Sequence, residues 1–318
     1  MNRIRLLASA IALACLITGS AALAEDCPLL PAFNQALQGR DLDAAKAVEA
    51  RIRIDAACGP FTLDVQRRRV LLEVTMAEAL TGRAGREAER EALLVDAEKP
   101  EVFWGASMAL GELRLAQRRF APAAKALDRA IEIVKNTTKT PRPPASAVIQ
   151  QMVDRAAQAR LLAANEEQAP GAATYVQVAK DHRDGTVGGS LSADVRGLKP
   201  RSVPIPVNFA TATAVPTEIG RQAIDELLAA IKEQRPAEVL IVGHTDERGS
   251  DAMNMRLSEQ RARMVADFLR TNGIAANIRI LAMGRREPLR IEDPAGLTQQ
   301  DVWALNRRVE WRRPAAGE

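Results

Sequence analysis

The chain of 318 residues is long enough for two domains of about 100–200 residues, and its 26% charged and 47% apolar residues are typical of globular proteins. Lys and Arg exceed Asp and Glu by 44 − 40 = 4, and aromatic residues make up only 3%. Such a small positive excess and so few stacking side chains argue against a nucleic-acid partner. With only two histidines, we expect no metal site and no cofactor.

The first 24 residues have the pattern of a secretory signal peptide. A basic start with Arg3 and Arg5 precedes an apolar run over 6–18 and the small-x-small sequence at 22–24. Because the run is shorter than the ~20 residues that span a bilayer, we expect cleavage after residue 24, with a retained anchor as the alternative. Lipid attachment at Cys15 is disfavoured, since the usual Leu of a lipoprotein box is one place out. The mature chain is then an exported protein with no transmembrane segment.

Cleavage leaves two cysteines, Cys27 and Cys58. In an oxidising compartment two remaining cysteines usually pair. A catalytic thiol or a metal site is the alternative, but neither cysteine has a histidine nearby. We therefore predict a structural disulfide between Cys27 and Cys58, which would stabilise the fold by about 3–4 kcal/mol.

Residues 25–165 are predicted to form an all-α domain, because they are rich in Ala, Leu, Glu and Arg and contain no convincing alternating strand. Gly and Pro divide them into helices of roughly 12–20 residues that pair as helical hairpins. The breaks are expected at Gly39, 58–60, 82–85, 99–100 and 137–144. A last helix is expected over about 145–165, and residues 166–200 are predicted to be a linker.

Six positions between 110 and 130 match the spacing of a tetratricopeptide helix pair, in which small residues let two helices approach closely. They are Leu110, Gly111, Phe120, Ala123, Leu127 and Ala130. The segment 40–47 loosely repeats the segment 119–126. The region therefore resembles a short, divergent tetratricopeptide array of two or three hairpins. Binding of a protein partner and a spacer role both remain open.

Residues 201–313 switch to the periodicity of an α/β domain. We expect a two-layer α/β sandwich with the order βαβαββ, so the whole chain is a two-domain α+β protein. The expected strands are 203–209, 238–243, 277–283 and 307–312, and the expected helices are 217–234 and 254–271.

One cation of the helix 254–271 lies on its apolar stripe. Arg261 follows Leu257 by four residues and precedes Met264 by three, so it shares their face. An inward cation is costly unless a partner meets it. Asp246 closes the preceding strand and is the expected partner. The pair could be structural, or it could bind a zwitterion, with Arg holding a carboxylate and Asp an ammonium.

Three motifs lie in this last third of the chain. They are Gly243-His244-Thr245-Asp246-x-x-Gly249, Asn254-x-x-Leu257-Ser258-x-x-Arg261-Ala262 and Asn306-Arg307-Arg308-Val309-Glu310. In order and spacing, from about 203 to 312, they resemble the OmpA-like (OmpA/MotB/Pal) peptidoglycan-binding domain. The resemblance implies a periplasmic, wall-associated protein that binds the diaminopimelate-containing stem peptide of peptidoglycan without a covalent bond. Contact with the inner face of the outer membrane would be indirect.

The resemblance also assigns roles to residues. Asp246 and Arg261 would hold the ligand's ammonium and carboxylate, and Asn254 would brace the site. Thr245 would line it, and Arg307 would add positive charge for the stem carboxylates. The chain departs from the family pattern at three positions, which leaves affinity and stem preference open. These are Ala210, where the family often has an acid, and Ala282 and Met283, in place of a glycine and an aromatic residue.

Three functions follow from this pattern. The leading one is a wall-bound adaptor whose helical domain binds or spaces a protein partner. The alternative is an interaction scaffold whose α/β domain has lost wall binding. A wall-modifying enzyme would need a catalytic constellation, and the chain shows no Ser/His/Asp order, paired catalytic carboxylates or H-E-x-x-H motif. Two charge runs, Arg67–Arg69 and Arg312–Arg313, are expected to be solvated.

Overall fold

The computed structural model describes residues 27–166, 191, 194–200, 202–207, 209, 213–291 and 296–313. The predicted signal peptide, most of the predicted linker and Ala210 lie outside these residues. The chain divides into two compact units. The first comprises residues 1–110 with 138–140, and the second comprises residues 111–137 with 141–318.

The first unit is helical, and its helices end where the sequence predicts breaks. They are α2 (Leu30–Gln38), α3 (Leu42–Ile54), the 3-10 turn η2 (Gly59–Phe61), α4 (Thr62–Ala79) and α5 (Glu87–Glu98). The predicted disulfide joins Cys27 to Cys58. Both cysteines are buried in a small core with Phe33 and Ile52, so the bridge holds the start of the first helix to the end of the second hairpin helix.

The expectation that Arg67–Arg69 form a solvated face is wrong. Arg69 is buried and forms ion pairs with Glu49 and Glu73, which are buried as well. Lys46 adds a further ion pair to Glu73 at 3.1 Å. Consecutive helical residues lie about 100° apart, so three arginines in a row cannot all face the same side. We call Arg69, Glu49, Glu73 and Lys46 the Arg69 cluster.

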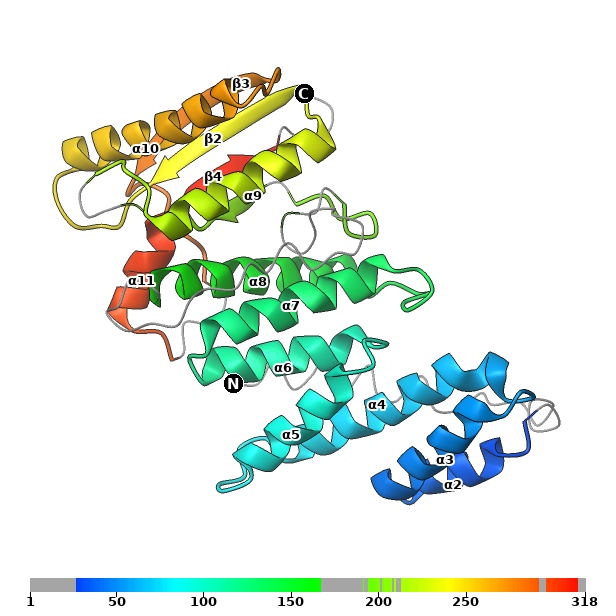
Figure 1. Cartoon of the computed structure of the whole chain (residues 1–318). Coiled ribbons are helices and arrows are strands. Elements are labelled where there is room, and N and C mark those ends of the chain that lie inside the picture. Colours follow the sequence, from blue (N-terminus) through cyan, green and yellow to red (C-terminus); the bar gives the residue numbers. More distant parts are fainter. Residues whose placement is uncertain are drawn as a thin grey trace. The chain divides into compact units, whose positions relative to one another are not determined.

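The second unit carries the predicted α/β fold. Its sheet has the order β1-β4-β2-β3, with β2 parallel to β3 and β4 antiparallel to both β1 and β2. The elements are β1 (Ser202–Ile205), α9 (Glu218–Gln234), β2 (Glu238–His244), α10 (Asp251–Thr271), β3 (Asn277–Gly284), α11 (Gln299–Asn306) and β4 (Val309–Arg312). Figure 1 shows this sheet with its helices. The predicted βαβαββ order is confirmed, with α11 as the short helix before the last strand.

Hydroxyl side chains cap the two long helices of this domain at their first turns. Thr217 accepts a hydrogen bond from the Gly220 amide, and Ser250 accepts one from the Met253 amide. The second cap starts α10 at Asp251, three residues before the predicted start. Apolar faces of α9 and α10 pack on one side of the sheet around the buried Trp311.

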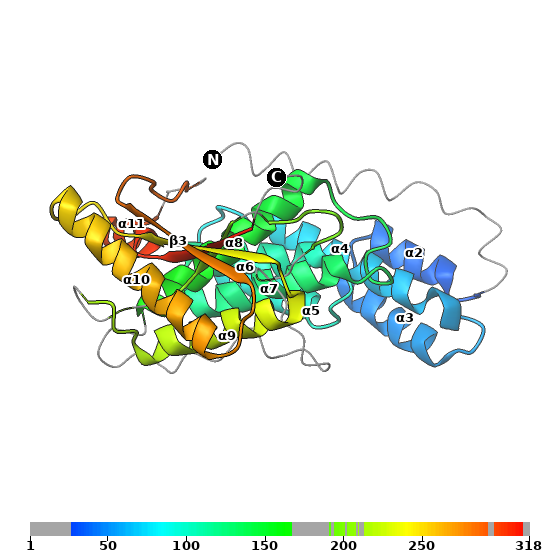
Figure 2. The ribbon, with the colours of Figure 1, turned by 90° about the horizontal axis from the view of Figure 1, so that it is seen from above.

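Two helices from the predicted all-α domain belong to the second unit. They are α7 (Phe120–Lys135) and α8 (Ser146–Glu166), and they follow α6 (Trp104–Ala116), which crosses the boundary between units. The helix α8 packs along α7, which it overlies when seen from above (Figure 2), and it also contacts β1 and α11. A Cβ atom on Gly111 would lie 2.6 Å from the Leu127 side chain, so the small residue permits the close approach of α6 and α7. The compact units therefore do not follow the predicted domain boundary at residue 165.

Candidate functional site

The site is built where β2, β3 and α10 converge. A Cβ atom on Gly243 would lie 2.1 Å from the Ser258 carbonyl oxygen of α10, so only glycine allows the strand to approach the helix this closely. The Ser258 hydroxyl accepts a hydrogen bond from the Gly284 amide at 3.0 Å and donates one to the Met255 carbonyl at 2.9 Å. These contacts fix the ends of both strands against α10, and Thr245 and Asp246 follow directly.

Asp246 lies in the loop after β2 and is only 6% exposed. Its carboxylate accepts hydrogen bonds from the Arg248 amide (3.1 Å) and from the Arg248 guanidinium (3.1 and 2.7 Å). Arg307 donates a further hydrogen bond at 3.0 Å. Burial alone would raise the pKa of Asp246, but these hydrogen bonds outweigh it and lower the pKa. The carboxylate is therefore ionised at neutral pH.

Arg261 projects from the buried face of α10 and is 4% exposed. Its Nε donates to the Thr213 carbonyl at 3.2 Å, and its guanidinium lies 4.7 Å from the centre of the Phe209 ring. Within the described part of the chain it forms no salt bridge, so the expected direct pair with Asp246 is not formed. Burial and the charge of Arg307 lower the pKa of Arg261 to about 10, while the charge of Asp246 raises it. The guanidinium is thus charged and almost fully desolvated.

The other three predicted site residues lie around this pair of charges. Asn254, in the first turn of α10, donates from Nδ2 to the Arg248 carbonyl at 3.0 Å, which holds the loop. The Thr245 amide donates to the Gly284 carbonyl at 2.9 Å, and its buried hydroxyl has no hydrogen-bond partner among the described residues. Arg307 caps the C-terminus of α11 and bridges Asp246 to Asn165 of α8, at 3.0 and 2.9 Å.

Sequence reasoning missed Arg248, Trp303 and Asn165. The Arg248 guanidinium lies 4.3 Å from the centre of the Trp303 ring, and the Trp303 indole donates to Glu247 at 3.0 Å. A signal for Arg248 existed, because an Asp in a loop often accepts the amide two residues later, which brings that side chain beside the carboxylate. No comparable signal marks Asn165.

A second group of charged side chains lies next to the site, and its members bond one another. Glu310 of β4 is buried and accepts from Arg308 at 2.7 Å, Arg312 at 2.9 Å and Ser202 at 2.8 Å. The buried His244 lies 3.5 Å from Glu310, and burial lowers the pKa of this histidine. The imidazole is therefore neutral at pH 7.

The expectation of a solvated Arg312–Arg313 terminus is also wrong. Arg312 pairs with Glu310 and Glu287. Arg313 lies 4.3 Å from the centre of the Trp311 ring and donates to the Pro200 carbonyl at 2.6 Å. Both arginines thus tie the last strand to its neighbours.

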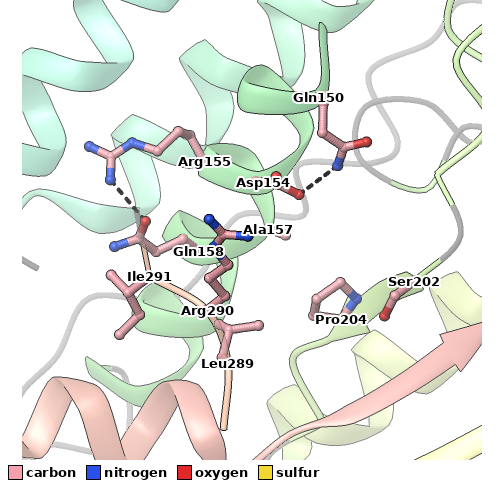
Figure 3. Close-up of a pocket in the computed structure, with 10 residues that line it drawn as sticks. All are labelled: Gln150, Asp154, Arg155, Ala157, Gln158, Ser202, Pro204, Leu289, Arg290 and Ile291. Atoms are coloured by element: carbon pink, nitrogen blue, oxygen red, sulfur yellow. Dashed lines mark hydrogen bonds between the residues drawn. The ribbon is translucent and has the colours of Figure 1, made fainter. Parts of the chain in front are cut away.

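A cleft of about 420 Å³ lies between α8, β1 and the segment after β3 (Figure 3). None of the predicted site residues lines it. Most of its polar side chains bond protein groups: Gln150 donates to Asp154, Arg155 to Gln158 and Glu112, and Ser202 to Glu310. Arg290 is exposed and forms no hydrogen bond or ion pair with another described residue. The described lining therefore lacks the buried charged side chains that are found at the Asp246 loop.

Comparison with known proteins matches part of the chain to a family. The model of the OmpA family matches residues 208–300. Residues 208–300 form an OmpA-like domain. This range contains Thr245, Asp246, Asn254 and Arg261, and the resemblance is confirmed for residues 208–300. The third motif, with Arg307, lies just beyond the matched range.

Curated relatives match about a third of the chain. Outer membrane protein A of Serratia odorifera is 39% identical over 100 residues, which cover 29% of this chain and 41% of the relative. Outer membrane protein A of Shimwellia blattae is 43% identical over 111 residues, covering 32% and 45%. The chain thus spans less than half the length of these relatives.

Solved structures also match about a third of the chain. The cell wall anchor of the T6SS from Pseudomonas aeruginosa is 27% identical, with 35% of this chain and 76% of that chain covered and a TM-score of 0.29. The peptidoglycan-associated lipoprotein from Burkholderia pseudomallei is 24% identical, with 36% and 89% covered and a TM-score of 0.29. Among the described residues, the helices are too short or too polar to cross a membrane.

Proposed function

We propose that this protein binds peptidoglycan non-covalently in the periplasm, through the diaminopimelate-containing stem peptide. One observation carries the proposal: the Arg261 guanidinium is buried and has no carboxylate partner among the described residues. It lies close enough to Asp246 for the charge of this carboxylate to raise the pKa of Arg261. A desolvated cation without an anion is costly in a folded protein. A ligand carboxylate would offset this cost, and Asp246 would hold the ligand's ammonium.

The geometry gives each residue a task in binding. The Arg261 fork would bind a carboxylate with two parallel hydrogen bonds. The ligand ammonium would take the place of the Arg248 guanidinium on Asp246. This exchange costs little, because the Arg248 side chain is 55% exposed and stays hydrated when it leaves. Thr245 would offer its buried hydroxyl to the ligand, Asn254 would keep the loop in position, and Arg307 would attract the remaining stem carboxylates.

The rest of the chain would act as an adaptor without catalysis. The matched relatives are named outer membrane proteins, which supports a place in the cell envelope, at the wall and near the inner face of the outer membrane. The proposed signal peptide would deliver the chain there. The predicted all-α region 25–165, with its tetratricopeptide-like helix pairs, would bind or space a protein partner.

The proposal is tested by co-sedimentation of the mature protein with purified diaminopimelate-type sacculi. Wild type should pellet, and free diaminopimelate should release it. Asp246→Ala and Arg261→Lys should each weaken binding more than about tenfold, because a hydrogen bond to a charged group contributes about 1.5–3 kcal/mol and Lys lacks the planar fork.

Matched controls lie on the same helix. Arg263 and Asp267 are exposed, and their salt bridges stay within α10. Arg263→Lys and Asp267→Ala should therefore pellet like wild type, with circular dichroism confirming the fold of every variant. If wild type stays in the supernatant at low salt, the domain is a scaffold that has lost wall binding, and the proposal is wrong.

A further inference from the structure

We propose that the wall-binding site is completed from outside the OmpA-like domain, by Asn165 of α8, which positions Arg307. This inference rests on the proposed function, since it concerns the same site. It assigns the end of the helical region a part in ligand binding, in addition to any partner that the first unit binds.

Arg307 is held at both ends of its guanidinium. One Nη donates to the Asp246 carboxylate at 3.0 Å, and the other donates to the Asn165 side-chain oxygen at 2.9 Å. Its side chain is 30% exposed, so neighbouring packing alone does not fix it. A long side chain loses up to about 2 kcal/mol of rotamer freedom when it is fixed in one position. The Asn165 hydrogen bond supplies part of that restraint before any ligand arrives.

The helix that precedes Arg307, α11, is also held by a residue from outside the OmpA-like domain. Asp301 of α11 accepts hydrogen bonds from the Arg118 guanidinium at 2.7 and 3.1 Å. Burial alone would raise the pKa of Asp301, but the hydrogen bonds from Arg118 and Thr298 lower it. Arg118 belongs to the turn between α6 and α7, so α11 is held near its first turn by Arg118 and just after its last residue by Asn165.

A buried ion pair fixes α8 on the domain. Arg160 of α8 pairs with Glu226 of α9, and both side chains are less than 10% exposed. Arg160 lies five residues before Asn165 on the same helix, so this pair sets the position of the helix end that reaches Arg307. The α7–α8 hairpin is in this sense part of the binding module.

The inference predicts a ligand-binding defect that acts through Arg307. Asn165→Ala removes the acceptor, leaves Arg307 with more rotamers and should weaken binding to sacculi about threefold to tenfold. Asn165→Asp keeps an acceptor at the same place and should bind within about twofold of wild type. In an Arg307→Ala background, Asn165→Ala should have no further effect, because the two changes remove the same interaction.

The experiment uses co-sedimentation of the full mature chain with diaminopimelate-type sacculi. Gln150→Ala is the control on the same helix, since Gln150 donates to Asp154 within α8, and it should bind like wild type. Circular dichroism checks the fold of each variant. Equal binding by Asn165→Ala and wild type, equal weakening by Asn165→Asp, or an undiminished effect in the Arg307→Ala background would overturn the inference while the proposed function stands. If wild type itself does not pellet, the proposed function has failed, and the inference fails with it.

Discussion

Two clusters of arginine and carboxylate in this molecule differ in their access to water. In the Arg69 cluster of the first unit, Arg69 is 7% exposed and its partners Glu49 and Glu73 are 3% and 0% exposed. At the OmpA-like site, the carboxylate of Asp246 is equally buried, but its partners Arg248 and Arg307 are 55% and 30% exposed. The cation that joins Glu49 to Glu73 is thus buried, although Lys46 at the edge of the Arg69 cluster is 38% exposed. Both cations that bond Asp246 are partly exposed. We call the Arg69–Glu49–Glu73 triad closed and the Asp246 site open.

This difference is the physical basis for proposing a binding role for Asp246 and a structural role for Arg69. A buried charge exchanges a buried partner only at high cost, because each lone charge would remain in a medium of low dielectric constant. An exposed guanidinium can leave its carboxylate and be hydrated at once, so exchange with a ligand ammonium is nearly neutral in free energy. The closed triad is therefore expected to contribute to the fold, and the open site is the one that the proposed function uses.

The largest expected effect breaks the closed cluster. Arg69→Ala leaves two buried carboxylates without their shared cation and should lower the free energy of unfolding by about 3–5 kcal/mol. Urea unfolding followed by far-UV circular dichroism measures this. Arg68→Ala is the matched control, because Arg68 is half-exposed and donates to Asn34 at 2.6 Å, and it should cost less than about 1 kcal/mol. If the two variants lower the free energy of unfolding equally, the buried ion pairs of Arg69 are not a special source of stability.

A smaller effect is expected when Asp246 loses the Arg248 guanidinium, which competes with the ligand ammonium for this carboxylate. Arg248→Ala removes the guanidinium that occupies Asp246 but leaves the loop fixed by Asn254, which binds a backbone carbonyl, and by the Glu247–Trp303 hydrogen bond. We expect sacculus binding to become about twofold to fivefold tighter, corresponding to up to about 1 kcal/mol. Arg263→Ala serves as the control for lost surface charge. Weaker binding of Arg248→Ala would show that Arg248 contacts the ligand rather than competing with it.

The sequence predicts the elements well where local signals set them. Glycine and proline mark the ends of the helices, and Thr217 and Ser250 cap two of them. Three motifs place Asp246, Asn254 and Arg261 in one region. The burial of Arg69 could also have been inferred, since Val65 and Glu73 lie four residues before and after it on the same helix face.

Long-range contacts account for what the sequence does not predict. Asp246 bonds Arg307, which is 61 residues away, instead of pairing directly with Arg261. The docking of α8 depends on Arg160 and Glu226, which are 66 residues apart. Nothing in the local pattern around Asn165 indicates that it faces Arg307. Such pairs depend on how helices and strands pack after they have formed. The periodicity of one sequence does not indicate which distant residue a side chain will contact.

The smallest expected effect is on the pH dependence of the free energy of unfolding, to which Glu73 and Asp246 should contribute with opposite signs. Burial raises the pKa of Glu73 above its ordinary value of 4.5, although Arg69 and Lys46 oppose the shift. The unfolded chain then loses this proton first as pH rises, so the Glu73 carboxyl makes stability fall as pH rises from about 4.5 to the folded pKa. For Asp246 the folded pKa is below 3.8, so its contribution is present above pH 3.8 and is lost as pH falls through the folded pKa.

The two signs can be separated with near-isosteric variants. Glu73→Gln should flatten the stability profile above about pH 4.5, and Asp246→Asn should flatten it below about pH 3.8, in urea unfolding measured between pH 2.5 and 6. Asp267→Asn, on the exposed face of α10, should change neither limb. If both variants flatten the same part of the pH profile, the pKa values of Glu73 and Asp246 are shifted in the same direction. The distinction between a closed and an open cluster would then have no energetic basis, and the choice of Asp246 as the exchangeable carboxylate would rest on solvent exposure of its arginines alone.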